Sequence, residues 1–354
     1  MFCCYICMET ACIMKLQGRK LVIAIVAGVV LALAIGCGIV WRIYAGTEYV
    51  GDNPKWVYIP KGADADSVTA ILERDLGSAG RRAATMWRSY GASPSKAHGA
   101  YRVEPGTRSV DIFKRVARGA QTPVKLTFNN VRLLSQLAGR MARVLEADSV
   151  AFMSAIDSVL SARGYSTEEY VGAFFPDTYE FYWTAPAADV VTRLADTRDK
   201  FWTPERRSRA AALGITPMQA TVIASIAEEE TNRSDERGVV ARLYLNRLNR
   251  RMPLQADPTV KYAVGDFSIK RITGKHLAVV SPYNTYRNAG LPPGPIRMPE
   301  RATIDALLES KPHDYIYMCA SPDFSGHHLF ARDLATHNRN AAAYHRALNQ
   351  RNIK

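Results

Sequence analysis

Three consecutive glutamates, Glu228, Glu229 and Glu230, are the residues of this 354-residue sequence best suited to acid–base chemistry. The apolar residues before them recur at helical spacing: Met218, Val222, Ile223, Ile226 and Ala227. A helix turns about 100° per residue. Glu230 therefore falls roughly 30° from the centre of the apolar stripe and Glu229 about 70° from it, whereas Glu228 points to the opposite side. We expect Glu230 to be the carboxylate that this helix carries toward the interior.

Burial would give Glu230 the property that a general acid needs. Removing a carboxylate from water favours its neutral form and raises its pKa. A carboxylic acid that is still protonated near neutral pH can donate its proton to a leaving group. The opposing interpretation is that the glutamates form a solvated helix end. For Glu228 both interpretations remain open.

Local signals define the helices that would position these side chains. Thr216 is a predicted N-cap, followed by Pro217 at the first helical position and by Gln219 three residues after the cap. After the glutamates, Ser234 is the predicted N-cap of a second helix, with two acidic residues in its first turn.

Polar residues at alternate positions follow the second helix. Gln255, Asp257 and Thr259 alternate along a segment that we predict to be extended, which would place them on one face. The region around Asn284 and residues 290–294 is predicted to form a rigid loop that lines the same cleft as these three polar residues.

An aromatic-rich segment, residues 174–183, lies upstream of the glutamates. Aromatic rings beside carboxylates often form the wall of a sugar site, and rings packed against the catalytic helix would instead form core. Both interpretations remain open, although the hydroxyls of Tyr179 and Tyr182 need polar partners.

Composition and charge restrict the class of protein. A hydrophobic content of 47% and modest charge indicate a globular protein. The net charge of +13 suits an acidic polymer or simply a soluble surface, and the membrane anchor described next argues against nucleic acid as a partner. Of six cysteines only Cys319 lies beyond that anchor, so no internal disulfide is expected there. The histidines lack ligand spacing, so we expect no metal and no cofactor.

An uncharged apolar run from Leu21 to Trp41 is long enough to span a bilayer core of about 30 Å as a helix. Lys15, Arg19 and Lys20 precede it, so the positive-inside rule places the N-terminus in the cytoplasm and the rest of the chain outside. A cleaved signal peptide and lipidation at Cys37 are the alternatives.

Four segments in order resemble one known family. Residues 224–231, ASIAEEET, resemble the ASI-x-E-x-E-T signature of the endolytic murein transglycosylase (YceG-like) family. Arg247 with residues 254–260, residues 282–296 and the upstream residues 175–179 resemble its other motifs. Four ordered motifs across about 120 residues are a specific signal.

The resemblance implies which residues act. The family's catalytic glutamate is the second Glu of E-x-E-T, which is Glu230 here. We expect the substrate-binding residues to be Glu228, Arg247, Gln255, Asp257, Thr259, Tyr283, Asn284 and Tyr286.

The resemblance also implies an α+β architecture. We expect a cytoplasmic N-terminus over residues 1–20, a single transmembrane helix over 21–41, a small LysM-like α/β module over 49–124 and a mixed helix/strand, YceG-like catalytic domain over 125–354. Modules of the LysM type often bind glycan, and a mere spacer is the alternative.

The resemblance implies a lytic transglycosylase acting on peptidoglycan glycan strands at the inner membrane, with the peptidoglycan synthesis machinery as a further expected partner. In this reaction the C6 hydroxyl of the muramic acid residue attacks its own C1, so one glutamate suffices. A hydrolase that uses water needs a second carboxylate, for which Asp257 is the candidate. A non-catalytic wall-binding scaffold is the third hypothesis.

Overall fold

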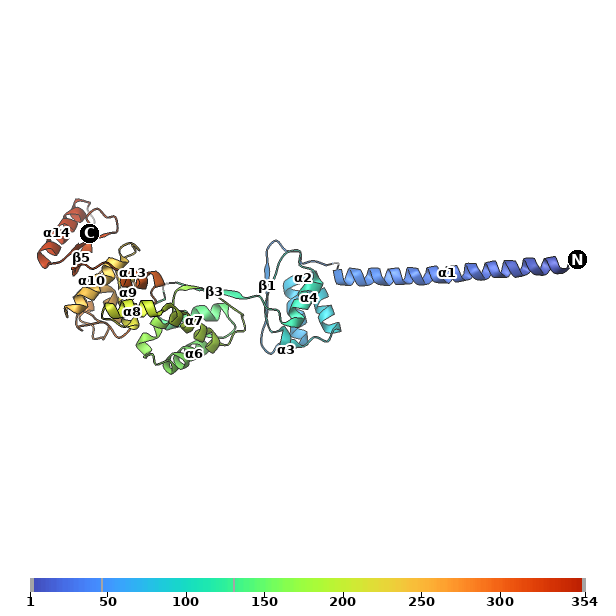
Figure 1. The fold of residues 1–354 in the computed structure, drawn as a ribbon, viewed down its shortest axis with the longest axis horizontal. Coiled ribbons are helices and arrows are strands. Elements are labelled where there is room, and N and C mark those ends of the chain that lie inside the picture. The colour runs from blue at the N-terminus through green and yellow to red at the C-terminus, as the bar shows by residue number, and fades with distance from the viewer. Residues whose placement is uncertain (1–2, 46, 130, 352–354) are drawn as a thin grey trace. The chain divides into compact units, whose positions relative to one another are not determined.

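The computed structural model describes residues 3–45, 47–129 and 131–351. By their contacts the residues divide into two compact units, Met1–Pro123 and Val124–Lys354 (Figure 1). Both units mix helices with short two-stranded sheets, as the predicted α+β class requires. Each unit has its own hydrophobic core.

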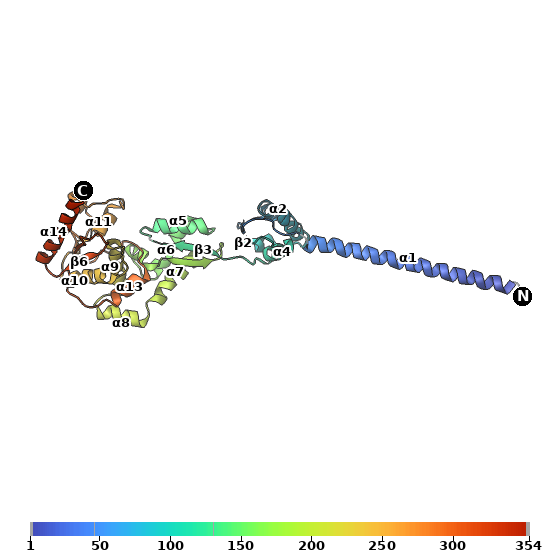
Figure 2. The same cartoon turned by 90° about the horizontal axis from the view of Figure 1, so that it is seen from above.

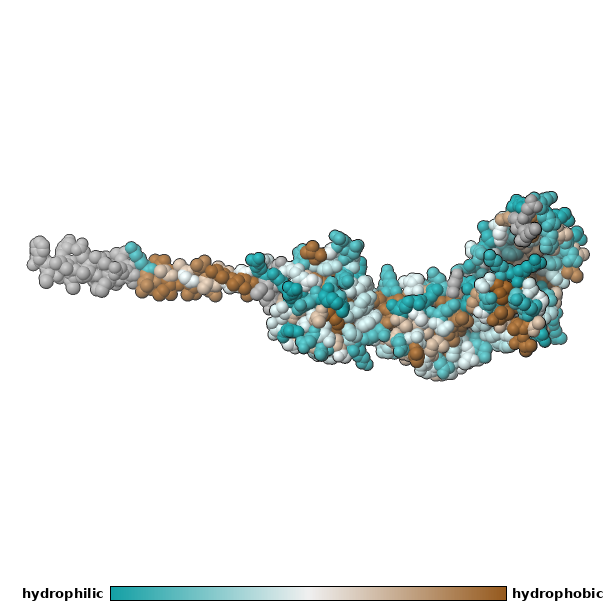
Figure 3. Space-filling view, turned by 180° about the vertical axis from the view of Figure 1, so that it is seen from behind, coloured by the Kyte–Doolittle hydropathy of each residue, from teal (hydrophilic) through white to brown (hydrophobic). Residues whose placement is uncertain are grey.

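Helix α1 spans Cys3–Ala45, and its segment Arg19–Arg42 is long and apolar enough to cross a membrane. The apolar side chains of that segment are exposed, and they form the brown rod in Figure 3. The helix predicted from Leu21 to Trp41 is therefore confirmed as a helix.

The rest of the first unit packs helices on a two-stranded antiparallel sheet. Strand β1 (Lys55–Ile59) pairs antiparallel with β2 (Gly99–Val103), and α2 (Ala65–Ser89), α3 (Pro94–Ala97) and α4 (Ser109–Arg118) complete the unit. The sequence predicts two short helices within the α2 range. The structure has one helix that is broken at Gly77, where φ is 57°.

The second unit begins with a sheet that the sequence analysis missed. Strand β3 (Val124–Phe128) pairs antiparallel with β4 (Asp177–Phe181). Phe174, Phe175 and Tyr179 are buried, which makes these aromatics core; Tyr182 alone of the tyrosines in this segment is exposed, at 55%. The Tyr179 hydroxyl finds its partner in the carbonyl of Phe175 at 3.0 Å.

Helices surround this sheet and lead to the glutamates. They are α5 (Leu134–Val144), α6 (Ser149–Ala162), the 3-10 helix η1 (Thr167–Ala173), α7 (Ala187–Phe201) and α8 (Pro204–Ala212). The sequence predicts one helix over residues 190–213, and this is wrong. Thr203 caps a new helix that starts at Pro204, whose ring is accepted at a first helical position but not in a helix interior.

Helix α9 (Pro217–Glu230) is the centre of the second unit. It packs against α10 (Arg237–Asn249), α11 (Asp257–Val264) and α13 (Arg301–Leu308), and Figure 2 shows it between α10 and α13. The short α12 (Gly274–Leu277) follows α11. The predicted start of α9 is confirmed, because Thr216 and Gln219 form a reciprocal capping box.

The predicted N-cap of α10, Ser234, is wrong, since the N-cap is Glu236, two residues later, and the helix begins at Arg237. Glu236 is buried, and its carboxylate accepts a hydrogen bond from the backbone nitrogen of His328 at 2.8 Å. This long-range bond, and not a local cap, fixes the turn before α10. His328 belongs to β6 (His328–Ala331), which pairs antiparallel with β5 (Tyr317–Ala320). The sequence predicts this hairpin from the apolar run at residues 315–320 and its partner at residues 326–330, and it predicts a final helix from Arg332 onward, which is α14 (Leu334–Gln350).

Candidate active site

Glu230 is the last residue of α9 and lies partly exposed beside α10. The hydroxyl of Tyr244, a residue of α10 that is 3% exposed, donates a hydrogen bond to Glu230 Oε1 at 2.5 Å. One carboxylate oxygen is thereby held, and the other is left to interact with a ligand.

The surroundings raise the pKa of Glu230 from 4.5 to about 7. Burial is the main cause, because it disfavours the anion. The hydrogen bond from Tyr244 acts in the opposite direction, the charge of Asp257 raises the pKa and that of Lys261 lowers it. A carboxyl group with this pKa exchanges its proton readily at neutral pH, so it can serve as both acid and base.

Asp257 and Tyr286 form a second polar pair, and the charge of Asp257 acts on Glu230. The Tyr286 hydroxyl donates to Asp257 Oδ1 at 2.7 Å. Asp257 is exposed and Tyr286 partly exposed, so both are open to a ligand. We call Glu230, Tyr244, Asp257 and Tyr286 the Glu230 cluster.

The extended segment predicted over residues 255–259 is wrong. Residues from Asp257 onward form α11, with Pro258 in its first turn, and Gln255 has a left-handed φ of 49°. Asp257 is exposed at the helix start, whereas Thr259 is fully buried and bonds to the Ala256 carbonyl at 2.7 Å. The alternating residues therefore do not share a face.

Arg247 and Asn284 hold loops in place. Arg247 is buried and donates to the Pro253 carbonyl at 3.0 Å and to Gln255 Oε1 at 2.8 Å. Asn284 is fully buried, and its amide nitrogen donates to the carbonyls of Leu277 at 3.0 Å and Val279 at 2.9 Å.

The same Asn284 side chain orients the Glu230 cluster, since its oxygen accepts from the backbone nitrogen of Tyr286 at 3.1 Å. Tyr283 is partly exposed and packs on Tyr262 with ring centroids 4.6 Å apart. The loop Gly290–Pro293 lines a pocket at the start of α9 together with Met218 and Val222. That it also lines the sugar site stays a prediction.

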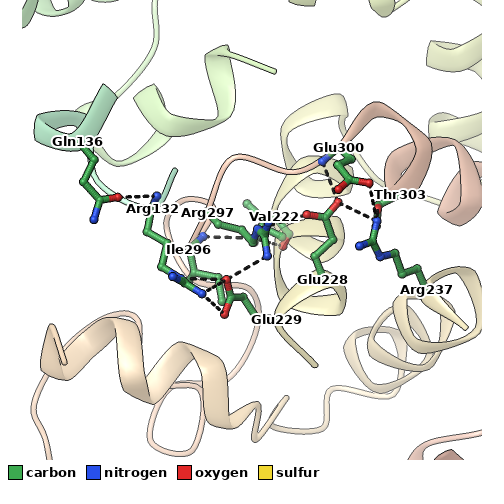
Figure 4. A network of polar contacts seen from close by, with 11 residues as sticks. Arg132, Gln136, Val222, Glu228, Glu229, Arg237, Ile296, Arg297, Glu300 and Thr303 are labelled. Carbon is green, nitrogen blue, oxygen red and sulfur yellow. Dashed lines mark hydrogen bonds and ion pairs between the residues drawn. The ribbon is translucent and has the colours of Figure 1, made fainter. Parts of the chain in front are cut away.

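Glu228 is the most buried of the three glutamates, contrary to the expectation that it faces away from the interior. Its side chain has no exposed area. It lies 3.2 Å from Arg297 Nε and accepts from the backbone nitrogen of Glu300 at 2.7 Å (Figure 4). Burial raises the pKa of Glu228, and hydrogen bonding and the charge of Arg297 oppose that rise.

Arg297 links Glu228 to Glu229, as Figure 4 shows. Its Nη1 donates to Glu229 Oε1 at 3.2 Å, and Arg132 binds both oxygens of Glu229 at 2.9 Å. The two glutamates therefore anchor the end of α9 from two sides, next to the residue that we expect to react. Arg297 is not predicted from the sequence, although it directly follows residues 282–296. Tyr244 is not predicted either, because no pattern singles out that residue.

Comparisons with known proteins show which proteins this chain is similar to. The YceG-like family matches residues 57–343. The endolytic murein transglycosylase of Bacillus subtilis (strain 168) is 25% identical over 83% of this chain and 86% of its own. That of Streptococcus pneumoniae serotype 2 (strain D39 / NCTC 7466) is 29% identical over 49% of this chain, which is 32% of the pneumococcal protein.

A solved structure is also similar. The crystal structure of a yceG-like protein from Listeria monocytogenes superposes with a TM-score of 0.55 at 26% identity, covering 82% of this chain and 99% of that one. The family match extends over most of the sequence and includes every residue of the Glu230 cluster. The chain therefore belongs to the YceG-like family.

Proposed function

We propose that this protein is an endolytic murein transglycosylase that cleaves the MurNAc–GlcNAc bond of peptidoglycan strands and leaves 1,6-anhydro-MurNAc ends. The observation that carries the proposal is the position of Glu230, a glutamate with a pKa of about 7 held by one hydrogen bond at a partly exposed helix end. The relatives named above carry the same activity in their names.

One glutamate can perform both proton transfers of this reaction. Protonated Glu230 gives its proton to the glycosidic oxygen as the C1–O bond breaks. The C6 hydroxyl oxygen of the same sugar then forms a bond to C1, and its proton returns to the Glu230 carboxylate. No water is consumed and the acid is restored. Between the two transfers Glu230 is an anion, which the Tyr244 hydroxyl stabilises.

The remaining predicted site residues divide by exposure. We assign sugar contacts to Gln255, Asp257, Tyr283 and Tyr286, which are exposed or partly exposed. We propose that the buried residues position these sugar-contacting side chains; the buried residues are Glu228, Arg247, Thr259 and Asn284.

The first unit suits a role at the membrane. We infer that residues 21–41 anchor the chain in the cytoplasmic membrane, with residues 1–20 in the cytoplasm and the YceG-like catalytic domain, residues 125–354, outside. The module at residues 49–124 is proposed to be LysM-like and to bind glycan. A membrane-anchored enzyme of this kind would act on nascent strands and so terminate their elongation beside the synthesis machinery.

The charge of Asp257 acts on Glu230, and this keeps a hydrolase with two carboxylates as the competing function. Cleavage rates of matched variants separate the two. A transglycosylase predicts that Glu230→Gln loses about 10²–10⁴-fold in kcat, while Asp257→Asn, which alters a sugar contact, raises KM and keeps kcat within about tenfold of the wild type. A hydrolase predicts that both variants are inactive.

The exposed Asp266, in the loop after α11, provides a matched control as Asp266→Asn. No cleavage by the wild type, together with intact cellular function of Glu230→Gln, would contradict both enzymatic proposals and favour a wall-binding scaffold.

A further inference from the structure

Two adjoining pockets lie at the start of α9, away from the Glu230 cluster. The larger has a volume of about 680 Å³ and the smaller about 520 Å³. Both are lined by Glu169, Thr216 and Met218, so they adjoin one another. The smaller one is also lined by residues 290–293, a part of the family-like motif that the Glu230 cluster does not use.

A buried arginine that forms no direct ion pair among the described residues lines the larger pocket, and the charges of Asp199 and Glu169 act on it from nearby. Arg198, on α7, is 6% exposed. Its Nε donates to the Gly172 carbonyl at 2.7 Å and its Nη1 to the Tyr165 hydroxyl at 2.8 Å, and both partners are neutral. Among the residues that the structure describes, no carboxylate forms an ion pair with it. Burial lowers the pKa of Arg198, which reflects the cost of holding this charge away from water.

Arg207 brings a second positive charge to the same pocket. It is exposed, its Nε donates to the Trp202 carbonyl at 3.0 Å, and its charge lowers the pKa of Arg198 further. The third arginine of the pocket, Arg163, is already paired with Asp196 at 2.6 Å and Asp199 at 2.9 Å. Neither guanidinium group forms an ion pair with a carboxylate of the described residues, although Glu169, Asp196 and Asp199 also line the pocket, so both are suited to bind a carboxylate from a ligand.

We propose that Arg198 and Arg207 bind a carboxylate of the peptidoglycan stem peptide while the glycan lies at the Glu230 cluster. This inference rests on the proposed function, which supplies a substrate whose peptides carry carboxylates.

The geometry fits a peptide of a few residues. Met218 and Glu230 are twelve residues apart on α9, which is roughly 18 Å along the helix. An extended chain covers at most about 3.5 Å per residue, so about five residues reach from one site to the other. The smaller pocket lies on this path, because Leu248 lines it and is one helical turn from Tyr244.

Binding of a charged and an uncharged ligand tests the proposal. The full-length chain carrying Glu230→Gln, in detergent micelles, is titrated calorimetrically with a muramyl pentapeptide that has free carboxylates, and with the same compound fully amidated. The free acid is expected to bind at least about tenfold more tightly. Arg198→Met and, in case that buried variant fails to fold, Arg207→Ala should each remove this preference. Arg209→Ala is the matched control, because Arg209 is an exposed arginine of α8 that pairs with Glu309 and does not line the pocket.

Equal affinity for the two compounds, or a preference that survives both Arg198→Met and Arg207→Ala, would overturn the inference. Cleavage by the wild type distinguishes this failure from a failure of the proposed function. An enzyme that cuts strands but shows no preference for the free acid loses only the peptide site. If the protein prefers the free acid and Arg207→Ala removes this preference, but the wild type cuts no strand, then the carboxylate site is supported and the proposed activity is refuted.

Discussion

Removing the Tyr244 hydroxyl should move the pH dependence of the reaction upward. In Tyr244→Phe the ring that fills the space remains, and only the donor to Glu230 Oε1 is lost. This bond stabilises the anionic form of Glu230 and so holds its pKa down. Without it the pKa of Glu230 rises.

The magnitude follows from the strength of a hydrogen bond to a charged group. Such bonds contribute about 1.5–3 kcal/mol, and 1.36 kcal/mol corresponds to about one pH unit in a titration. Because the reaction requires protonated Glu230 at its first step, activity falls as pH rises through the pKa of Glu230, which is about 7 in the wild type. In Tyr244→Phe this alkaline limb should lie about one to two pH units higher.

The assay is kcat/KM for strand cleavage between about pH 5 and pH 10, which reports the ionisation of the free enzyme. Tyr170→Phe is a matched control, because Tyr170 is 4% exposed and its hydroxyl donates to Asp157 Oδ1 at 2.9 Å. Its alkaline limb should coincide with that of the wild type. An unmoved or lowered limb in Tyr244→Phe would refute the assignment of this bond to the reacting carboxyl.

Three further predictions concern stability and binding. Glu230→Gln should match the wild type in free energy of unfolding near pH 4 and exceed it by up to about 3 kcal/mol at pH 8. The reason is that folded wild type binds the Glu230 proton more tightly than the unfolded chain does, with a pKa of about 7 against 4.5. The wild type therefore loses stability as pH rises through that window, and the Gln variant does not. Urea unfolding at both pH values measures this, and a constant difference would contradict it. Arg297→Ala should lower the free energy of unfolding by about 3–5 kcal/mol, because it removes the nearest cation from the buried Glu228 carboxylate. A loss below about 1 kcal/mol would show that Arg237 and the backbone nitrogen of Glu300 are enough to stabilise that carboxylate. Asn284→Ala should lower the free energy of unfolding by about 1–3 kcal/mol and raise KM more than it lowers kcat, because the loop that carries Tyr286 loses the side-chain bonds to Leu277 and Val279. An unchanged KM would argue against a positioning role for Asn284.

The start of α9 could be predicted because its signals are local. Thr216, Pro217 and Gln219 interact within one turn, and the structure shows the capping box that their order indicates. Glu230 was also singled out from the sequence, and the structure places it where its pKa is raised by burial.

The burial of Glu228 could not be predicted from its own helix. Residues 220–228 are buried all round, so α9 has no solvated face on which Glu228 could lie. Its charge is compensated by Arg297, which lies far along the chain, and by Arg237 at 3.8 Å. A helical projection contains no information about such partners.

Two errors arose where one pattern fitted two structures. Alternating polar residues at 255, 257 and 259 suit a strand, but Asp257 and Pro258 also suit the first turn of a helix, and the structure has α11 there. Motif membership likewise does not give position, since residues 290–293 line a pocket at the start of α9 that the motif alone did not predict.

The masses of the new glycan ends test the central claim most directly. Purified peptidoglycan is digested with the wild-type protein and with Glu230→Gln, and the fragments are analysed by mass spectrometry. The single-carboxylate mechanism predicts anhydromuramyl ends, lighter by one water molecule than hydrolytic ends, from the wild type alone. Reducing ends from the wild type, or anhydromuramyl ends from Glu230→Gln at the wild-type rate, would contradict it.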